Sequence, residues 1–328
     1  MANSKENNTL RESSKHKIAI LVLDNFVPFD VSIPYDVFSL VKHQNGVNAY
    51  DVTICGGDDV CTSHEWQITC KSKLDDLILA DTIIIPGLRN PVGFWDPIIF
   101  EVLQNAITKG TRIASICSGA FVLAASGVLN GLTATTHWDL IETLAQEYPQ
   151  VRVKPNVLFT DNGQILTSAG LASGIDLCLH MIRNDFGSVI AQTISQFFIM
   201  PMEREGNYKQ LTSPQHLQKE EPLAPLLTWL TDTISLNHSL QSISKHTHMS
   251  TRTLNRKFKA NLGVTPMAWL ANIRIKKAQI WLETTSSSIE QIATATGFNS
   301  ATSFRDTFKA SVGITPTNWR KIYKSSNG

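Results

Sequence analysis

Along residues 17–205, short and almost continuously apolar segments alternate with longer segments in which apolar residues recur every three or four positions. The short segments predict strands at 17–23, 50–55, 81–85 and 112–116. Because the middles of these segments are apolar without alternation, we expect a parallel sheet with both faces covered.

Prolines delimit the helices expected around these strands. Pro34 is expected in the first turn of a helix that includes residues 36–41. Pro97 is expected in the first turn of a helix over 98–108. A longer amphipathic helix is expected over 168–186, with the glycine after it as its stop. Alternating strands and helices predict a doubly wound α/β domain with a mainly parallel sheet.

The carboxyl-terminal part carries a helical pattern that occurs twice. Residues 258–269 match residues 308–319 at an offset of 50, with a phenylalanine at the start, a Gly-x-Thr-Pro segment inside and a tryptophan at the end. Each copy predicts a short helix, at 239–246 or 289–296, which is followed by a turn and a second helix.

Capping residues mark the boundaries within each copy. Ser250 and Ser300 are expected N-caps of the second helices, and Gly263 and Gly313 are placed to end them. A Thr-Pro pair then starts a further helix, which runs over 266–282 in the first copy. Each copy is therefore interpreted as a helix-turn-helix unit within an all-α domain. The residues expected in the two small cores are Ile243, Leu254, Phe258, Ile292, Phe304 and Phe308.

Length and charge support two domains of different character. The chain has 328 residues and a net charge of +1, but residues 226–328 hold 13 Lys and Arg against 4 Asp and Glu, which is +9 and leaves −8 for residues 1–225. Single cores rarely exceed about 250–300 residues. Polar composition predicts a disordered tail at 1–16 and a linker at 206–225, so the expected domains are 17–205 and 226–328.

Composition also excludes several classes of protein. No apolar run reaches the roughly 18–20 residues that a membrane span requires, and the amino-terminal tail lacks the apolar segment of a signal peptide. We therefore expect a cytoplasmic protein with no membrane partner. The 5 cysteines lack the paired spacing of a zinc site, so we expect reduced thiols, no metal and no cofactor.

Small and reactive residues follow two of the predicted strands. Cys117 and Ser118 come directly after the strand at 112–116, and Gly87 follows the strand at 81–85. Because ligands in doubly wound sheets bind beyond the carboxyl ends of strands, these residues are expected to share a site. A helix N-terminus lowers the pKa of a thiol, which makes Cys117 a candidate thiolate.

His137 and Asp30 complete the minimum set for thiol chemistry. The N–H groups of Gly87 and Ser118 are candidate donors to an oxyanion or a carboxylate. The alternative is structural: a lone cysteine is commonly a small buried apolar residue, and a lone histidine is commonly held by structural hydrogen bonds.

Five motifs of the first domain occur in the order found in a known family: FDVSIPYDVF, IIIPGL, SICSGAFVLAASGVLNG, TATTHW and TSAGLASGIDLCLHMI. This part resembles the ThiJ/PfpI domain of GlxA-type transcriptional regulators, a flavodoxin-like fold similar to class I glutamine amidotransferases. In the enzymes of that superfamily a nucleophilic cysteine maps onto Cys117, a histidine onto His137 and an acidic residue onto Asp30.

In the regulators, the resemblance implies a non-catalytic cleft that holds a small, often nitrogenous metabolite. The implied ligand-binding residues are Asp30, Gly87, Leu88, Cys117, Ser118 and His137. Leu88 stands where the family commonly has a second glycine.

The outward face of each second helix carries side chains that suit DNA. Arg and Asn bind guanine and adenine edges bidentately, while Lys and backbone N–H groups hold phosphates. The candidate DNA-binding residues are Ser250, Thr251, Arg252, Asn255, Arg256 and Lys259 in the first copy and Ser300, Thr302, Ser303, Arg305 and Lys309 in the second. An all-helical protein-interaction domain is the alternative.

Residues 226–328 resemble the AraC/XylS family DNA-binding domain along their whole length, including the segment GFNSATSFRDTFKASVGITPTNWR. Arg256 matches a frequent contact of that family, but the second copy has Asp306 there, so Arg305 is expected to take the basic role. The combined resemblance implies a homodimeric transcriptional activator whose partners are operator DNA, a small effector and RNA polymerase. Two alternatives are a cysteine-dependent hydrolase, amidase or hydratase, and a thiol-based redox-sensing regulator.

Overall fold

The computed structural model describes residues 15–43, 45–93, 95–199 and 223–324. The chain divides into two compact units. The first unit contains the described residues 15–181 and 194–199, and the second contains 182–193 and 223–324. Almost all of the expected tail (1–16) and linker (206–225) lies outside the described residues, so the proposed domain boundaries stay predictions.

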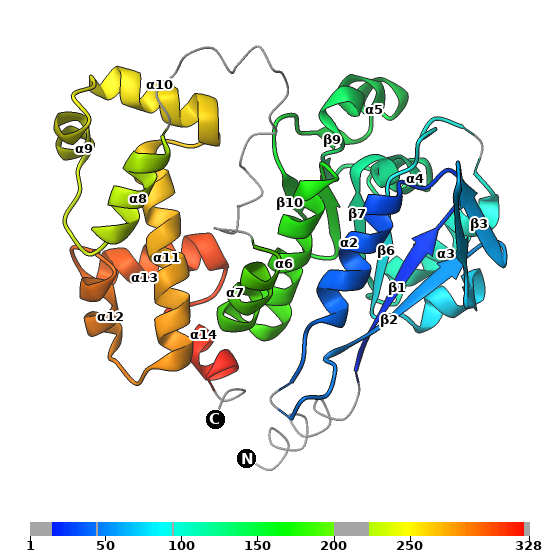
Figure 1. Cartoon of the computed structure of the whole chain (residues 1–328), viewed down its shortest axis with the longest axis horizontal. Coiled ribbons are helices and arrows are strands. Elements are labelled where there is room, and N and C mark those ends of the chain that lie inside the picture. The colour runs from blue at the N-terminus through cyan, green and yellow to red at the C-terminus, as the bar shows by residue number, and fades with distance from the viewer. Residues whose placement is uncertain (1–14, 44, 94, 200–222, 325–328) are drawn as a thin grey trace. The chain divides into compact units, whose positions relative to one another are not determined.

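A seven-stranded sheet forms the centre of the first unit (Figure 1). Neighbouring strands are parallel except for the outermost pair, β10 and β11, which is antiparallel. The strands, in their order across the sheet, are β10 (Phe159–Asp161), β11 (Ile165–Ser168), β7 (Arg112–Ile116), β6 (Thr82–Ile85), β1 (His16–Val22), β2 (Tyr50–Gly56) and β5 (Ser72–Lys73). The expectation of a doubly wound, mainly parallel sheet is confirmed.

Helices and two small sheets connect these strands, and the last two helices follow the final strand. The helices are α2 (Pro28–Ser39), η1 (Leu74–Leu79), α3 (Pro97–Thr108), η2 (Cys117–Gly119), α4 (Ala120–Ala125), η3 (Trp138–Leu140), α5 (Ile141–Glu147), α6 (Ala172–Phe186) and α7 (Ser188–Phe197). The small sheets pair β3 (Val60–Ser63) with β4 (Trp66–Thr69), and β8 (Thr133–Ala134) with β9 (Arg152–Val153). The four expected strands correspond to β1, β2, β6 and β7, and the expected helix at 98–108 corresponds to α3.

The prediction that Pro34 starts a helix is wrong. Helix α2 begins at Pro28, and Pro34 lies inside it. A proline within a helix removes one backbone hydrogen bond. The helix continues through this position because Val31, Val37 and Phe38 are all buried, so apolar packing offsets the missing bond.

The prediction of one helix over 168–186 is wrong in its first part. Ser168 ends strand β11, whose residues are all buried, and α6 begins only at Ala172. Between them Gly170 and Leu171 adopt left-handed conformations, with φ values of 84° and 51°. A right-handed helix cannot contain two such residues.

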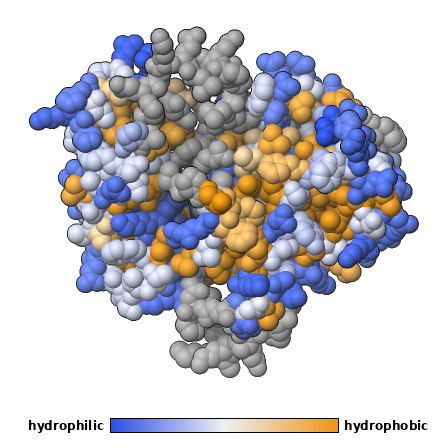
Figure 2. Space-filling view, in the orientation of Figure 1, coloured by the Kyte–Doolittle hydropathy of each residue, from blue (hydrophilic) through white to orange (hydrophobic). Residues whose placement is uncertain are grey.

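The second unit contains the helix-turn-helix repeat, and its visible face is more hydrophilic than that of the first unit (Figure 2). Its carboxyl-terminal helices are α8 (Ala224–Asp232), α9 (Leu240–His246), α10 (Thr251–Leu262), α11 (Pro266–Thr284), α12 (Ile289–Ala295), α13 (Ala301–Val312) and α14 (Pro316–Tyr323). The six expected core residues are fully buried, each at 0% exposure. No helix among the described residues is long and apolar enough to span a bilayer.

The expected caps of the repeat are confirmed. The Ser250 and Ser300 side chains each accept a hydrogen bond from the backbone N–H three residues later. Gly263 and Gly313 end α10 and α13 in the left-handed conformation. The first ring of each repeated segment meets its last ring edge to face, at 6.3 Å in the first copy and 6.1 Å in the second.

Glu283 forms a buried polar cluster within the second unit. Its carboxylate accepts hydrogen bonds from the backbone N–H groups of Ser188 and Val189 and from Nε1 of Trp319, at 2.8, 2.9 and 3.0 Å. Burial raises the pKa of Glu283 despite these donors. The cluster fixes the start of α7 to the helices of the second copy, a contact that no local sequence pattern indicates.

Candidate functional site

The first candidate site is the turn between strand β7 and helix α4. Cys117 occupies this turn with φ of 56°, a left-handed conformation that is uncommon for residues other than glycine. Such strain is found where the surrounding structure holds a side chain in a required place. We call this turn, with the residues packed on it, the elbow.

Glycine backbone closes the elbow on several sides. A Cβ atom added at Gly170 would overlap the Cys117 side chain, and one added at Gly87 would overlap both Asp30 and Cys117. One added at Gly119 would overlap the carbonyl oxygen of Ile85. The segments at Gly87 and Gly170 can therefore pack against Cys117, and the turn at Gly119 can pack against Ile85, only because these positions lack a side chain.

Asp30, in the first turn of α2, points into the elbow and is fully buried. Its Oδ1 accepts a hydrogen bond from the Leu171 N–H at 3.0 Å. Its Oδ2 lies against Gly87 and makes no hydrogen bond of standard geometry among the described residues, although the Gly87 N–H and the Cys117 thiol are close enough to lower the carboxyl pKa. Burial raises the pKa of Asp30 from 3.8 to about 6, although hydrogen bonds to the carboxylate lower it. A buried acceptor without a hydrogen bond of standard geometry is a site that a ligand could satisfy.

The surroundings of Cys117 disfavour the candidate thiolate and favour the structural alternative. Burial and, secondarily, the neighbouring charge of Asp30 raise the pKa of the Cys117 thiol to about 12. The helix N-terminus was expected to lower this pKa, but desolvation outweighs it because the residue is only 8% exposed. Burial therefore favours the neutral thiol at Cys117.

Ser118 holds the loop that follows strand β6. Its Oγ accepts a hydrogen bond from the Leu88 N–H and donates one to the Leu88 carbonyl, each at 2.7 Å. The Leu88 N–H is thus already used within the protein. Gly87, Leu88, Ser118, Asp30 and Cys117 are brought together as expected, but their ligand-binding roles stay predictions.

His137 lies beside this group without completing a catalytic set. The hydroxyl of its neighbour Thr136 donates to the Cys117 carbonyl at 2.9 Å, which fixes the segment next to the elbow. Burial lowers the pKa of His137, which favours the neutral form of its ring. Within the described parts of the chain, no hydrogen bond joins the His137 ring to Cys117 or Asp30.

Sequence reasoning missed Gly170 and Leu171 as parts of the site. Both follow strand β11, the neighbour of β7 in the sheet, and so they reach the same edge as Cys117. The run of small residues at 168–170 was the available signal, but it was assigned to a helix.

The second candidate site is the outward face of α10. Arg252, Arg256 and Lys259 are exposed on it. Asn255 is half-buried and donates from Nδ2 to the Thr251 carbonyl at 3.0 Å, so its acceptor atom remains available. The α10 face therefore presents three cations without a carboxylate between them.

Helix α13 presents a weaker positive charge. All five candidate residues of this copy, Ser300, Thr302, Ser303, Arg305 and Lys309, are exposed. Arg305 is paired with Glu290 of α12 at 2.6 Å, and the carboxylate of Asp306 is exposed next to it. The two copies thus have the same helical fold but differ in the charge of their exposed side chains.

Comparisons with known proteins match both parts of the chain. Residues 16–184 match the DJ-1/PfpI family, and residues 243–322 match a helix-turn-helix domain. The HTH-type transcriptional regulator GbdR of Pseudomonas aeruginosa is 25% identical over 311 residues, which cover 93% of this chain and 84% of that protein. The HTH-type transcriptional regulator GlxA of Rhizobium meliloti is 26% identical over 269 residues, which cover 81% of this chain and 83% of that protein.

A solved structure supports the same fold. The crystal structure of an AraC family transcriptional regulator from Pseudomonas putida superposes with a TM-score of 0.50 and 20% sequence identity, covering 56% of this chain and 99% of that one. Similarity at this level of identity shows a common fold over about half of the chain.

Proposed function

Because the chain belongs to the DJ-1/PfpI family and joins that domain to an AraC-type helix-turn-helix domain, we propose that it is a transcriptional activator controlled by a small metabolite. The observation that carries this proposal is the repeated helix-turn-helix unit, whose recognition helix α10 exposes Arg252, Arg256 and Lys259. It is a DNA-binding transcriptional regulator, and the metabolite and the sign of regulation are the proposed parts.

Operator DNA is the proposed macromolecular ligand. Helices α10 and α13 would each enter a major groove, and two such units reach successive grooves on one face of DNA when they lie about 34 Å apart. Guanidinium groups at Arg252 and Arg256 suit guanine edges, while Lys259 and Lys309 suit phosphates. Recruitment of RNA polymerase would follow once both units are bound.

The effector would bind at the elbow. The Oδ2 of Asp30 is a buried acceptor without a hydrogen bond of standard geometry, and Phe29, the preceding residue in the chain, is 49% exposed. Trp138, next to His137, is 44% exposed. A buried carboxylate together with accessible aromatic rings suits a nitrogenous cation, which can donate to the carboxylate or lie over a ring.

Binding without turnover is the proposed chemistry at the elbow. A thiol with a pKa of about 12 is a poor nucleophile at neutral pH, and His137 makes no hydrogen bond that would activate it in the described structure. These observations favour a sensor over the hydrolase, amidase or hydratase alternative. They also disfavour a redox sensor, because thiol oxidation proceeds through the thiolate.

We assign sensing and homodimerisation to the domain at 17–205 and DNA binding to that at 226–328, joined by the linker at 206–225. Residues 182–193 belong to the sensing domain in sequence and pack with the second unit. An effector can shift the DNA-binding state only if it binds one arrangement of the protein more tightly than another.

A thermal-shift screen of amino acids, amines and betaines against the full chain tests the effector. A metabolite that binds only the folded protein raises the midpoint by mass action. The proposal expects such a compound, expects Asp30→Asn to weaken its effect, and expects Cys117→Ser to retain it without product formation. A compound that the wild-type protein converts to a product, and that the Cys117→Ser variant neither binds nor converts, would instead support an enzyme.

A further inference from the structure

The connection from β2 to β6 covers one face of the sheet with little helical structure. In a doubly wound sheet such a crossover is typically a helix of ten or more residues. Here it consists of the β3–β4 hairpin, the short strand β5 and η1, which has 6 residues. Asp51, Thr53 and Cys55 of β2 alternate onto the same side of the sheet as Lys17 and Ala19 of β1, because 17 pairs with 51 and 19 with 53.

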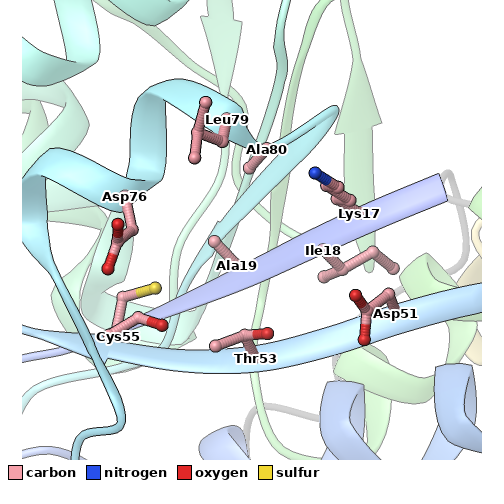
Figure 3. A pocket seen from close by; sticks show the side chains of 10 residues that line it. Lys17, Ile18, Ala19, Asp51, Thr53, Cys55, Asp76, Leu79 and Ala80 are labelled. Carbon is pink, nitrogen blue, oxygen red and sulfur yellow. The ribbon is translucent and has the colours of Figure 1, made fainter. Parts of the chain in front are cut away.

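This side of the sheet forms an open cleft of about 220 Å³ (Figure 3). Its volume is below the roughly 300–1,000 Å³ of pockets that hold drug-sized ligands, so any occupant is a small molecule. Figure 3 shows Lys17 and Asp51 at one end of the cleft and Asp76 of η1, beside Cys55, at the other. None of these residues belongs to the elbow.

The charged groups of the cleft are not neutralised by one another. Among the described residues Lys17 and Asp51 form no ion pair with each other, although they are direct partners in the strand register. Asp76 uses Oδ2 to accept the Lys73 N–H at 2.9 Å. Its second oxygen therefore remains available to a ligand.

The spacing of these charges points to the ligand's chemistry. Asp76 lies beside Cys55, so the distance from Asp51 to Cys55 approximates the separation of the two carboxylates. These two residues are four positions apart on one strand, which is about 13 Å at 3.3 Å per residue. We propose that the cleft binds a free amino acid with a cationic side chain. Lys17 receives the carboxylate, Asp51 receives the α-ammonium, and Asp76 receives the side-chain cation at the far end. One ammonium and two carboxylates also complement a ligand whose net charge is +1.

Isothermal titration of the full chain with three named probes tests this site without DNA. L-lysine carries all three charged groups, cadaverine lacks the carboxylate, and glutarate lacks both cations. We expect L-lysine to bind at one site per chain, cadaverine to bind at least about tenfold more weakly because it lacks the partner of Lys17, and glutarate not to bind because it lacks the partners of Asp51 and Asp76.

Substitutions separate the two ends of the cleft. Lys17→Met should weaken L-lysine about tenfold and leave cadaverine within about twofold, whereas Asp76→Asn should weaken both. Lys42→Met and Asp36→Asn are matched controls, because both residues are exposed and lie outside the cleft. No binding of L-lysine at millimolar concentration, or equal losses in Lys17→Met and Lys42→Met, would overturn the proposal.

Discussion

The elbow and the α10 face hold their polar groups in opposite ways. At the elbow, Asp30 and Cys117 are buried, and glycine backbone from distant segments encloses them. On α10, Arg252, Arg256 and Lys259 are exposed and are positioned only by the helix that carries them. Burial at the elbow raises the pKa of Asp30 and of Cys117, whereas the side chains on α10 are open to solvent and to a ligand.

This difference predicts where a substitution is felt. A change at the elbow disturbs packing or an unfavourable buried charge, so it should alter the stability of the fold. A change on the α10 face disturbs no internal contact, so it should alter DNA binding alone. The four predictions below test that separation, from the largest expected effect to the smallest.

Gly170→Ala should give the largest loss of stability. Both Gly170 and Gly163 have positive φ, but only at Gly170 would the new Cβ overlap Cys117, while Gly163 faces open space. We expect Gly170→Ala to cost about 3–4 kcal/mol and Gly163→Ala to cost about 1 kcal/mol. Urea unfolding of the two variants measures the difference, and equal costs would mean that the elbow is not tightly enclosed.

Asp30→Asn should stabilise the fold in a pH-dependent way. The pKa of Asp30 is about 6 in the folded protein and about 3.8 when unfolded. Its contribution to stability is therefore fully present below pH 3.8, where the carboxyl is protonated in both states, and it is lost as the pH rises through 6. We expect a gain of about 3 kcal/mol at pH 7.5 and almost none near pH 4. Unfolding curves at both pH values check this, with exposed Asp36→Asn as the control. A gain independent of pH would exclude a raised pKa as its cause.

Arg256→Ala should weaken operator binding by about 1–3 kcal/mol and relax the preference at one base pair, with no change in melting temperature. Asp306→Ala, at the matching position of the second copy, should not weaken binding, because it removes a negative charge facing DNA. Fluorescence anisotropy on specific and random duplexes compares the two. Equal losses of Arg256→Ala on both duplexes would contradict base reading by this residue.

Lys259→Ala should have the smallest effect on specificity. It should weaken binding to all sequences alike and reduce the slope of log affinity against log salt by about 1. Lys309→Ala, its counterpart on α13, should do the same if both helices contact phosphates. An unchanged slope in Lys309→Ala alone would mean that only the first copy touches the DNA backbone.

The same contrast explains what could be predicted from sequence. In the repeat, Ser250 caps α10 and Gly263 ends it, so each signal lies within one turn of the boundary that it sets. The pKa of Cys117 instead depends on burial by residues far along the chain, including Asp30 and Gly170. No local pattern carries that information, and the helix N-terminus, the one local signal present, pointed the wrong way.

Strand β11 was not predicted from the sequence, for a related reason. Its first three residues entered no prediction, and its last residue, Ser168, was assigned to the helix expected over 168–186 because small residues follow it. The parallel pairing with β7, which settles the matter, is a contact between segments far apart in sequence.

Selection of DNA sites from a random duplex pool by the full chain tests the central claim most directly. The account predicts enrichment of one motif with two half-sites about one helical turn apart, and loss of preference at one position of that motif with Arg256→Ala. No enriched motif, or the same motif with unchanged preference from Arg256→Ala, would contradict sequence reading by α10.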